Sequence, residues 1–202
     1  MSTRGRPARY TQDDLLAVVA RVFNERGYEA ASMADLARAS GLTKSAFYHH
    51  VSGKEELLRL ATNRALDALD GVFEALPVVE GGAVARLEVA LSRTAQILLA
   101  ELPYVTLLLR VRGNTEVERA VVSRRRAVDA RLAEIVREAM DAGEIRDDID
   151  PRLVTRLLFG MVNSITEWYR PEGRDAHAGG DGRDAVVRAV VELALDGLRA
   201  RR

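Results

Sequence analysis

The stretch from residue 36 to residue 54 carries side chains that suit contact with phosphate groups. It holds three basic residues and no acidic residue, so its formal charge is +3 (3 − 0). The chain has only two lysines, Lys44 and Lys54, and both lie here with two of its three histidines, His49 and His50. Clustered cationic side chains bind the nucleic-acid backbone because they release its condensed counterions. The stretch therefore predicts contact with nucleic acid.

The pattern around these residues predicts two short helices joined by a tight turn. Ser32 and Thr43 suit N-cap positions, and Gly41 between them suits a turn that needs positive φ. On the second helix Phe47 and Val51 are four residues apart and face inward. The opposite face presents hydrogen-bonding side chains: Lys44, Ser45, Tyr48 and His49. This is a helix-turn-helix pattern, whose second helix lies in a DNA major groove.

Other interpretations of this segment are weaker but open. Two short helices around a glycine also form ordinary helical hairpins, and Tyr48 could be a half-buried packing residue. His49 and His50 point about 100° apart on a helix, with no further ligands nearby, so a metal site is not expected.

The run from about residue 10 to residue 58 resembles the DNA-binding domain of the tetracycline-repressor (TetR) family of bacterial regulators. The resemblance covers about a quarter of the 202 residues, and it departs from the family at Val51, where most members have Phe. The positions that carry it are Phe23, Gly27, Tyr28, Ser32, Met33, Leu36, Ala37, Gly41, Leu42, Lys44, Tyr48, Lys54 and Leu57.

The resemblance implies which residues meet double-stranded operator DNA. Those expected on the recognition helix are Thr43, Lys44, Ser45, Tyr48, His49 and His50. Ser32 and Lys54 would add contacts to the phosphate backbone. Arg4 and Arg6 lie in a basic N-terminal arm that either contacts the backbone or minor groove or is only a solvated terminus.

The composition excludes several other classes of protein. The absence of Cys excludes disulfide frameworks, Cys-based zinc sites and thiol nucleophiles. No apolar run approaches the roughly 18 residues of a membrane span, so a cytoplasmic location without a membrane partner is expected. The 30 basic and 30 acidic residues cancel, but residues 1–60 carry +2 (9 − 7) and residues 61–202 carry −2 (21 − 23). No cofactor is expected.

The periodicity of the whole chain predicts an all-α fold. An N-terminal three-helix helix-turn-helix domain would be followed by a C-terminal helical domain for ligand binding and dimerisation, with boundaries at 1–9 (arm), 10–53 and 54–202. Apolar residues recur every three or four positions, and the prolines fall near breaks in this pattern. Helices are expected at 11–27, 32–40, 43–51, 54–76, 83–101, 103–112, 115–142, 151–169 and 184–200.

The last two helices carry wide apolar stripes that suit a homodimer. The resemblance implies a four-helix interface between subunits, which would place two recognition helices about 34 Å apart on a palindrome. The expected interface residues are Leu157, Met161, Ile165, Val187, Val191, Ala194 and Leu198. Alternatively, these helices pack only within one subunit.

The apolar surplus in residues 97–112 suits either a small-molecule effector pocket or a buried core helix. The candidate effector residues are Tyr104, Leu108, Arg110, Asn114 and Trp168. The segment from Trp168 to Gly173 resembles a subset of the family that responds to acyl-CoA thioesters. Arg124, Arg125 and Arg126 are interpreted as a solvated face with pairs along one helix.

Together these features predict a ligand-responsive repressor that releases its operator on binding an apolar effector. A helix-turn-helix protein could also be an activator. An all-helical enzyme is disfavoured because the chain has three His, no Cys and no paired-carboxylate motif. A helical lipid carrier or adaptor without DNA binding is the remaining alternative.

Overall fold

The computed structural model describes residues 11–43, 47–48, 51–170 and 182–199, and these ranges are almost entirely helical. They contain no strand and one isolated antiparallel bridge between Ile145 and Arg199. The predicted all-α fold is confirmed. The helices are α1 (Gln12–Arg26), α2 (Met33–Ser40), α4 (Lys54–Ala75), a 3-10 turn (Leu76–Val78), α5 (Ala83–Ala100), α6 (Leu102–Arg110), α7 (Glu116–Asp141), α8 (Pro151–Trp168) and α9 (Gly182–Leu198).

The first two helices begin at reciprocal caps. Thr11 Oγ1 accepts from the Asp14 N–H at 3.1 Å while Asp14 accepts from the Thr11 N–H at 3.0 Å, which confirms the predicted capping box. Ser32 and Asp35 repeat the arrangement at α2. The Thr11 and Ser32 hydroxyl groups also hydrogen-bond to these carboxylates, and together with the N–H groups they lower the pKa of both aspartates because they stabilise the carboxylate form. Gly41 ends α2 with φ 69°, the left-handed conformation predicted for the turn.

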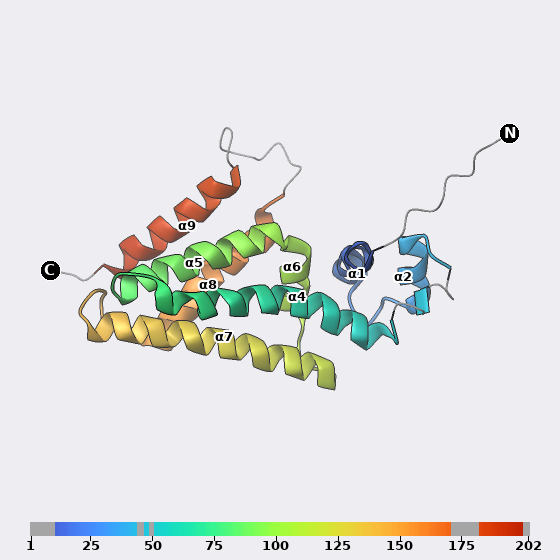
Figure 1. Cartoon of the computed structure of the whole chain (residues 1–202), viewed down its shortest axis with the longest axis horizontal. Helices are drawn as coiled ribbons and strands as arrows, with labels where there is room; N and C mark the ends of the chain where they lie inside the picture. The colour runs from blue at the N-terminus through green and yellow to red at the C-terminus, as the bar shows by residue number, and fades with distance from the viewer. Residues whose placement is uncertain (1–10, 44–46, 49–50, 171–181, 200–202) are drawn as a thin grey trace.

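Two helical bodies share the long helix α4 (Figure 1). In the smaller body α1 packs on α2 and on α4. In the larger body α4 packs on α7, α5 on α9 and α7, and α7 on α8. Buried leucines and small residues line α4 from Leu57 to Phe73, so one rigid element contributes to both cores. No helix of the described ranges is long and apolar enough to cross a membrane.

The apolar run 97–112 is shared by two helices, which break close to the predicted boundary between 83–101 and 103–112. α5 ends at Ala100, and Glu101 takes a non-helical conformation (φ −111°, ψ 30°) before Pro103 enters the first turn of α6. Because Pro is tolerated in a first turn, the chain can bend here and send α6 across the domain boundary. α6 packs against α1 and α4, so it lies between the two bodies.

Candidate DNA interface and effector pocket

In the described part of the helix-turn-helix segment, the residues predicted to face inward are buried and Tyr48, predicted to face outward, is exposed. The Phe47 N–H donates to the Thr43 carbonyl at 2.9 Å, as in a helix that begins at Thr43. Phe47 and Val51 are buried, whereas the Tyr48 side chain is 45% exposed. Thr43 and Ser32 are also exposed. The remaining DNA candidates lie outside the described residues: Lys44, Ser45, His49, His50, Arg4 and Arg6.

Lys54 holds the start of α4 against the segment that follows α1. Its Nζ donates to the carbonyl oxygens of Tyr28 at 2.8 Å and Glu29 at 3.1 Å, and it lies 4.5 Å above the Tyr28 ring. Burial raises the pKa of Tyr28 to about 12, and the charge of Glu55 adds to the shift. The lysine is therefore engaged within the domain, and its predicted phosphate contact stays a prediction.

The junction between the two bodies is polar and closely bonded. Arg64 on α4 pairs with Glu101 through two hydrogen bonds (2.7 and 3.1 Å) and with Asp13 on α1 at 3.3 Å. The same guanidinium lies 4.8 Å above the ring of Tyr104 on α6. This cluster ties α1, α4 and the start of α6 together.

A second set of contacts fixes α6 to the end of α1. Asn24 Nδ2 donates to the Pro103 carbonyl at 2.7 Å, and Arg110 donates in return to the Asn24 carbonyl. Two predicted effector residues, Tyr104 and Arg110, are thus placed at the domain junction. They contact α1 and α4 at this junction, and they do not line the larger cavity of the C-terminal helices, which is described below.

Two further effector candidates also lie away from that cavity. Asn114 lines a smaller cleft of about 310 Å³ at the junction, and its N–H is one of three that donate to Glu118 Oε2. Trp168 is exposed at the end of α8, edge-on to Tyr169. Of the five predicted effector residues, Leu108 lines the main cavity.

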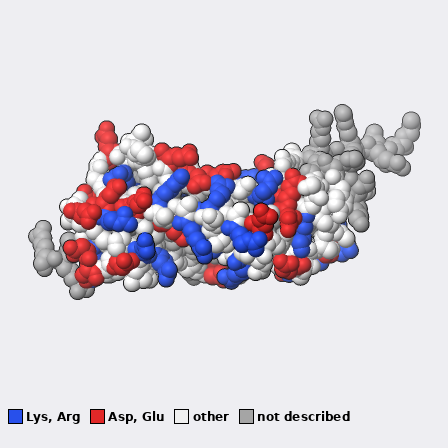
Figure 2. Space-filling model, turned by 90° about the horizontal axis from the view of Figure 1, so that it is seen from below, with Lys and Arg blue, Asp and Glu red and all other residues white. Residues whose placement is uncertain are grey.

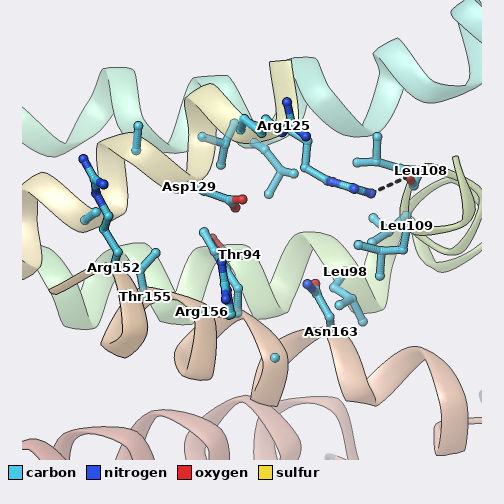
Figure 3. A pocket seen from close by; sticks show the side chains of 18 of the residues that line it. Thr94, Leu98, Leu108, Leu109, Arg125, Asp129, Arg152, Thr155, Arg156 and Asn163 are labelled. Atoms are coloured by element: carbon cyan, nitrogen blue, oxygen red, sulfur yellow. Dashed lines mark hydrogen bonds between the residues drawn. The ribbon is translucent and has the colours of Figure 1, made fainter. Parts of the chain in front are cut away.

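That cavity has a volume of about 880 Å³ and lies among α5, α6, α7 and α8 (Figure 3). One end is mostly apolar, with Leu98 of α5 and Leu108 and Leu109 of α6, and the Arg125 guanidinium reaches it to donate to the Leu108 carbonyl. The apolar lining residues are Leu69, Leu98, Val105, Leu108, Leu109, Val128, Ala130, Ala133 and Phe159. A concave site with an apolar wall and a few polar groups is the usual form of a small-molecule pocket.

Basic side chains line the pocket as well. Seven charged residues line it: Arg125, Arg126, Arg137, Arg152, Arg156, Asp129 and Glu134. Their formal charges sum to +3 (5 − 2). Within the described ranges no carboxylate lies within 4.0 Å of any of these five guanidinium groups, although the surface seen in Figure 2 intermingles basic and acidic side chains. The pocket therefore offers unpaired cations, which attract an anion.

Asp129 is an acidic residue of the pocket on which two of these arginines, Arg125 and Arg156, act electrostatically. It keeps access to solvent, yet desolvation by the walls raises its pKa, and the charges of Arg125 and Arg156 oppose the shift only in part. Arg125 Nη1 donates to the Leu108 carbonyl at 3.1 Å, which connects α7 to α6. The pocket is thus physically linked to the helix that holds α1.

The prediction of pairs along one helix is wrong for Arg124, whereas the charge of Arg125 does act on Asp129, four residues on in the same helix. Arg124 bonds across to α4, to Asp67 at 2.8 Å, Asp70 at 2.5 Å and Asn63 at 3.0 Å. Arg125 and Arg126 line the pocket. The sequence did indicate this difference, because consecutive residues of a helix are rotated by about 100° about its axis and so face different neighbours. Sequence reasoning also missed the polar pocket residues Thr94, Arg152, Arg156 and Asn163.

The predicted dimer residues divide between surface and core. Leu157 (59% exposed) and Met161 (38%) lie on the outer face of α8, beside Leu153, and Leu193 of α9 is 69% exposed. The other five predicted residues pack inside this chain: Ile165, Val187, Val191, Ala194 and Leu198. The apolar surface offered to a second subunit is therefore narrower than the sequence stripe.

Comparison with known proteins identifies the family. Residues 15–61 match the model of bacterial regulatory proteins of the tetR family, and residues 80–198 match a tetracyclin repressor-like C-terminal domain. The chain is 28% identical over 204 residues to the transcriptional repressor KstR2 of Rhodococcus jostii, which covers 97% of this chain and 94% of that protein.

Two solved structures support the same assignment. SCO3833, a TetR-family regulator of Streptomyces coelicolor, shares 49% identity and a TM-score of 0.84, with 99% of this chain and 98% of that chain covered. AibR in complex with isovaleryl coenzyme A and operator DNA shares 25% identity and a TM-score of 0.74, with 90% and 96% covered. The chain belongs to the TetR family and is a DNA-binding transcriptional regulator, not an enzyme.

Proposed function

We propose that this regulator is a homodimeric repressor that releases a palindromic operator when an acyl-CoA thioester binds in the pocket among α5–α8. The observation that carries the proposal is the pairing of an apolar end with five arginines that lack carboxylate partners in the described ranges. An acyl group matches the apolar end. The phosphates of coenzyme A match guanidinium groups, which bind them in bidentate geometry.

Two relatives support the repressor and the effector class. KstR2 is named as a transcriptional repressor, and AibR binds both isovaleryl coenzyme A and operator DNA. Since the proposed target is chromosomal DNA, the protein acts in the cytoplasm. The DNA contacts come from the recognition helix with Thr43 and Tyr48, joined by Ser32 at the start of α2.

The second subunit would cover the exposed apolar face of α8 and α9. Leu153, Leu157 and Met161 follow each other at four-residue spacing, so they form one ridge, and Leu193 lies on α9. A twofold axis through such a face makes each ridge meet its own copy. This arrangement fixes the separation of the two recognition helices, which a palindromic operator requires.

The route from pocket to DNA runs through α6. Leu108 accepts a hydrogen bond from Arg125 of the pocket, and Pro103 and Arg110 bond to Asn24 of α1. An anionic effector competes for Arg125 and so favours an arrangement in which α6 is less restrained. The coupling can be no larger than the difference in effector affinity between the DNA-bound and DNA-free arrangements.

The test is a titration of the full-length protein on a DNA fragment from upstream of its own gene. Isovaleryl-CoA and hexanoyl-CoA should each weaken the protein–DNA complex, whereas free coenzyme A should do so less because it lacks the acyl group. Retention of DNA at all thioester concentrations, with no change of melting temperature, would refute the effector class. Thioester binding without any DNA binding would instead favour the carrier.

A further inference from the structure

We infer that the effector carries an oxygen substituent on its buried part, and that Thr94 selects it by a hydrogen bond. The pocket then prefers hydroxyl- or oxo-substituted acyl groups over saturated ones of equal length. The inference rests on the proposed function for the coenzyme A part, but the selection by Thr94 concerns the inner part of the pocket and can be tested separately.

Thr94 is a buried hydroxyl without a partner. The residue is 5% exposed, it lines the pocket, and within the described residues its Oγ1 makes no hydrogen bond. Buried polar atoms in folded proteins are nearly always paired, because an unpaired one loses its water without compensation. An unpaired hydroxyl in the wall of a cavity therefore points to a partner that enters the cavity.

Other threonines of the same helical body show what Thr94 does not do. Thr62, Thr106 and Thr155 each donate to the carbonyl four residues earlier, at 2.7, 2.7 and 2.8 Å. This is the usual way for a helical threonine to satisfy its hydroxyl. Thr94 lies in the middle of α5 and forms no such bond to its own helix. Its hydroxyl is left available to the pocket.

The surroundings of Thr94 fit an oxygen on the ligand. Figure 3 shows it near the centre of the pocket, with Asp129 of α7 on one side, Arg156 of α8 on the other, and Asn163 further along toward Leu98. Leu98, one turn further along α5, begins the apolar end. A saturated chain that reached Leu98 would pass Thr94 and seal its hydroxyl against hydrocarbon. A hydroxyl or carbonyl at this depth would pair with it instead.

The experiment compares matched ligands on matched variants. Binding of hexanoyl-CoA, 3-hydroxyhexanoyl-CoA and 5-oxohexanoyl-CoA to the full-length protein is measured by calorimetry. Thr94→Val keeps the shape of the side chain and removes the hydroxyl. Thr155→Val is the control, because Thr155 is buried in the same pocket but its hydroxyl already bonds to the Pro151 carbonyl.

For the wild type we expect at least one oxygenated thioester to bind about ten-fold tighter than hexanoyl-CoA. Thr94→Val should abolish this preference, by weakening the oxygenated ligand or tightening the saturated one, and Thr155→Val should keep it. Equal binding of all three thioesters, or a preference that survives Thr94→Val, would overturn the inference and leave the proposed effector class intact. If Thr94→Val weakened the binding of all three thioesters equally, the inference would also be overturned. Thr94 would then bond to the thioester carbonyl that all three ligands share.

If no thioester bound, the proposed effector class would be overturned, but the preference of Thr94 for an oxygenated ligand would still have to be tested. Hexanoate and 5-oxohexanoate then serve as probes, since they need only an arginine and the inner pocket, with the shift of melting temperature as the measurement. A larger shift with 5-oxohexanoate that Thr94→Val removes would support the selection. Equal shifts, or none, would overturn it.

Discussion

Two neighbouring arginines show how differently the two regions of this molecule use the same side chain. Arg124 joins α7 to α4 through Asp67 and Asp70, whereas Arg125, one residue on, lines the pocket without a carboxylate partner in the described ranges. At the α4–α7 contact and the domain junction, charges are neutralised within the protein. In the pocket they are not. Unpaired charge next to a cavity, more than charge itself, distinguishes a binding region from a structural one.

The largest expected effect comes from removing the unpaired charges. Arg125→Ala combined with Arg156→Ala should weaken isovaleryl-CoA binding about 10- to 100-fold, since each charge-assisted hydrogen bond to a phosphate is lost. The melting temperature should fall only slightly, because neither arginine has a carboxylate within 4.0 Å in the described ranges and Arg125 gives the fold a single hydrogen bond, to the Leu108 carbonyl. Calorimetry with a parallel thermal melt measures both. Unchanged binding would mean that the phosphates lie elsewhere.

The complementary change removes a paired charge. Arg124→Ala should lower the free energy of unfolding by about 1–2 kcal/mol, a value kept small because the side chain is partly exposed and the ion pairs are screened by solvent. Effector affinity should stay within about two-fold of the wild type. Urea unfolding and calorimetry provide the comparison. A loss of effector binding as large as that of the pocket variant would erase the distinction between the regions.

A change at the domain junction should leave effector binding intact but reduce the effect of the effector on DNA binding. Arg64→Ala removes the contacts of α4 with Glu101, Asp13 and Tyr104. Effector affinity in the absence of DNA should be retained, while the factor by which effector weakens DNA binding should fall about five-fold, within the usual range of coupling energies. Anisotropy titrations of operator DNA with and without isovaleryl-CoA measure that factor. An unchanged factor would exclude this cluster from the signal route.

The smallest expected effect is a pH dependence from Asp129. Its pKa is raised, mainly by desolvation, so protonation becomes accessible as the pH falls toward that value. Protonation removes a negative charge from the pocket, and an anionic effector should then bind about two- to five-fold tighter at the lower pH. Asp129→Asn should bind like the protonated form and lose the pH dependence contributed by this group. Steeper pH dependence in the variant would contradict the assignment.

Much of the fold was predictable because its signals are local. The capping residues Thr11 and Ser32, the glycine at position 41 and the period of the apolar residues define helix bounds within a few positions. The inward Phe47 and outward Tyr48 followed from the same spacing. These features depend on neighbours within about one helical turn, which the sequence displays directly.

The pocket was not predictable to the same degree, because it is built by helices far apart in sequence. Tyr104 and Arg110 were chosen for their place in an apolar run, but the bend at Glu101 turns α6 so that both face the junction. Conversely, Arg152 and Arg156 of α8 resemble ordinary surface arginines until α5 and α7 enclose the space before them. No pattern along one helix records such an enclosure.

The dimer surface illustrates the intermediate case. Leu157, Met161 and Ile165 have the same four-residue spacing, but a row at that spacing drifts around the helix, and Ile165 turns into the core while Leu157 stays outside. The stripe showed correctly that α8 has an apolar side. Which part of that side is covered by α5 and α9 depended on packing.

Within the described residues, three hydrogen bonds that connect α6 to α7 and α1 end on main-chain carbonyls, those of Leu108, Pro103 and Asn24. A carbonyl is present whatever side chain its residue carries. The apolar lining of α6 could therefore change during evolution, and with it the size of effector accepted, while these links to α7 and α1 stayed in place. The fold thus allows ligand preference and signal transmission to diversify independently, which suits a scaffold that serves many regulators.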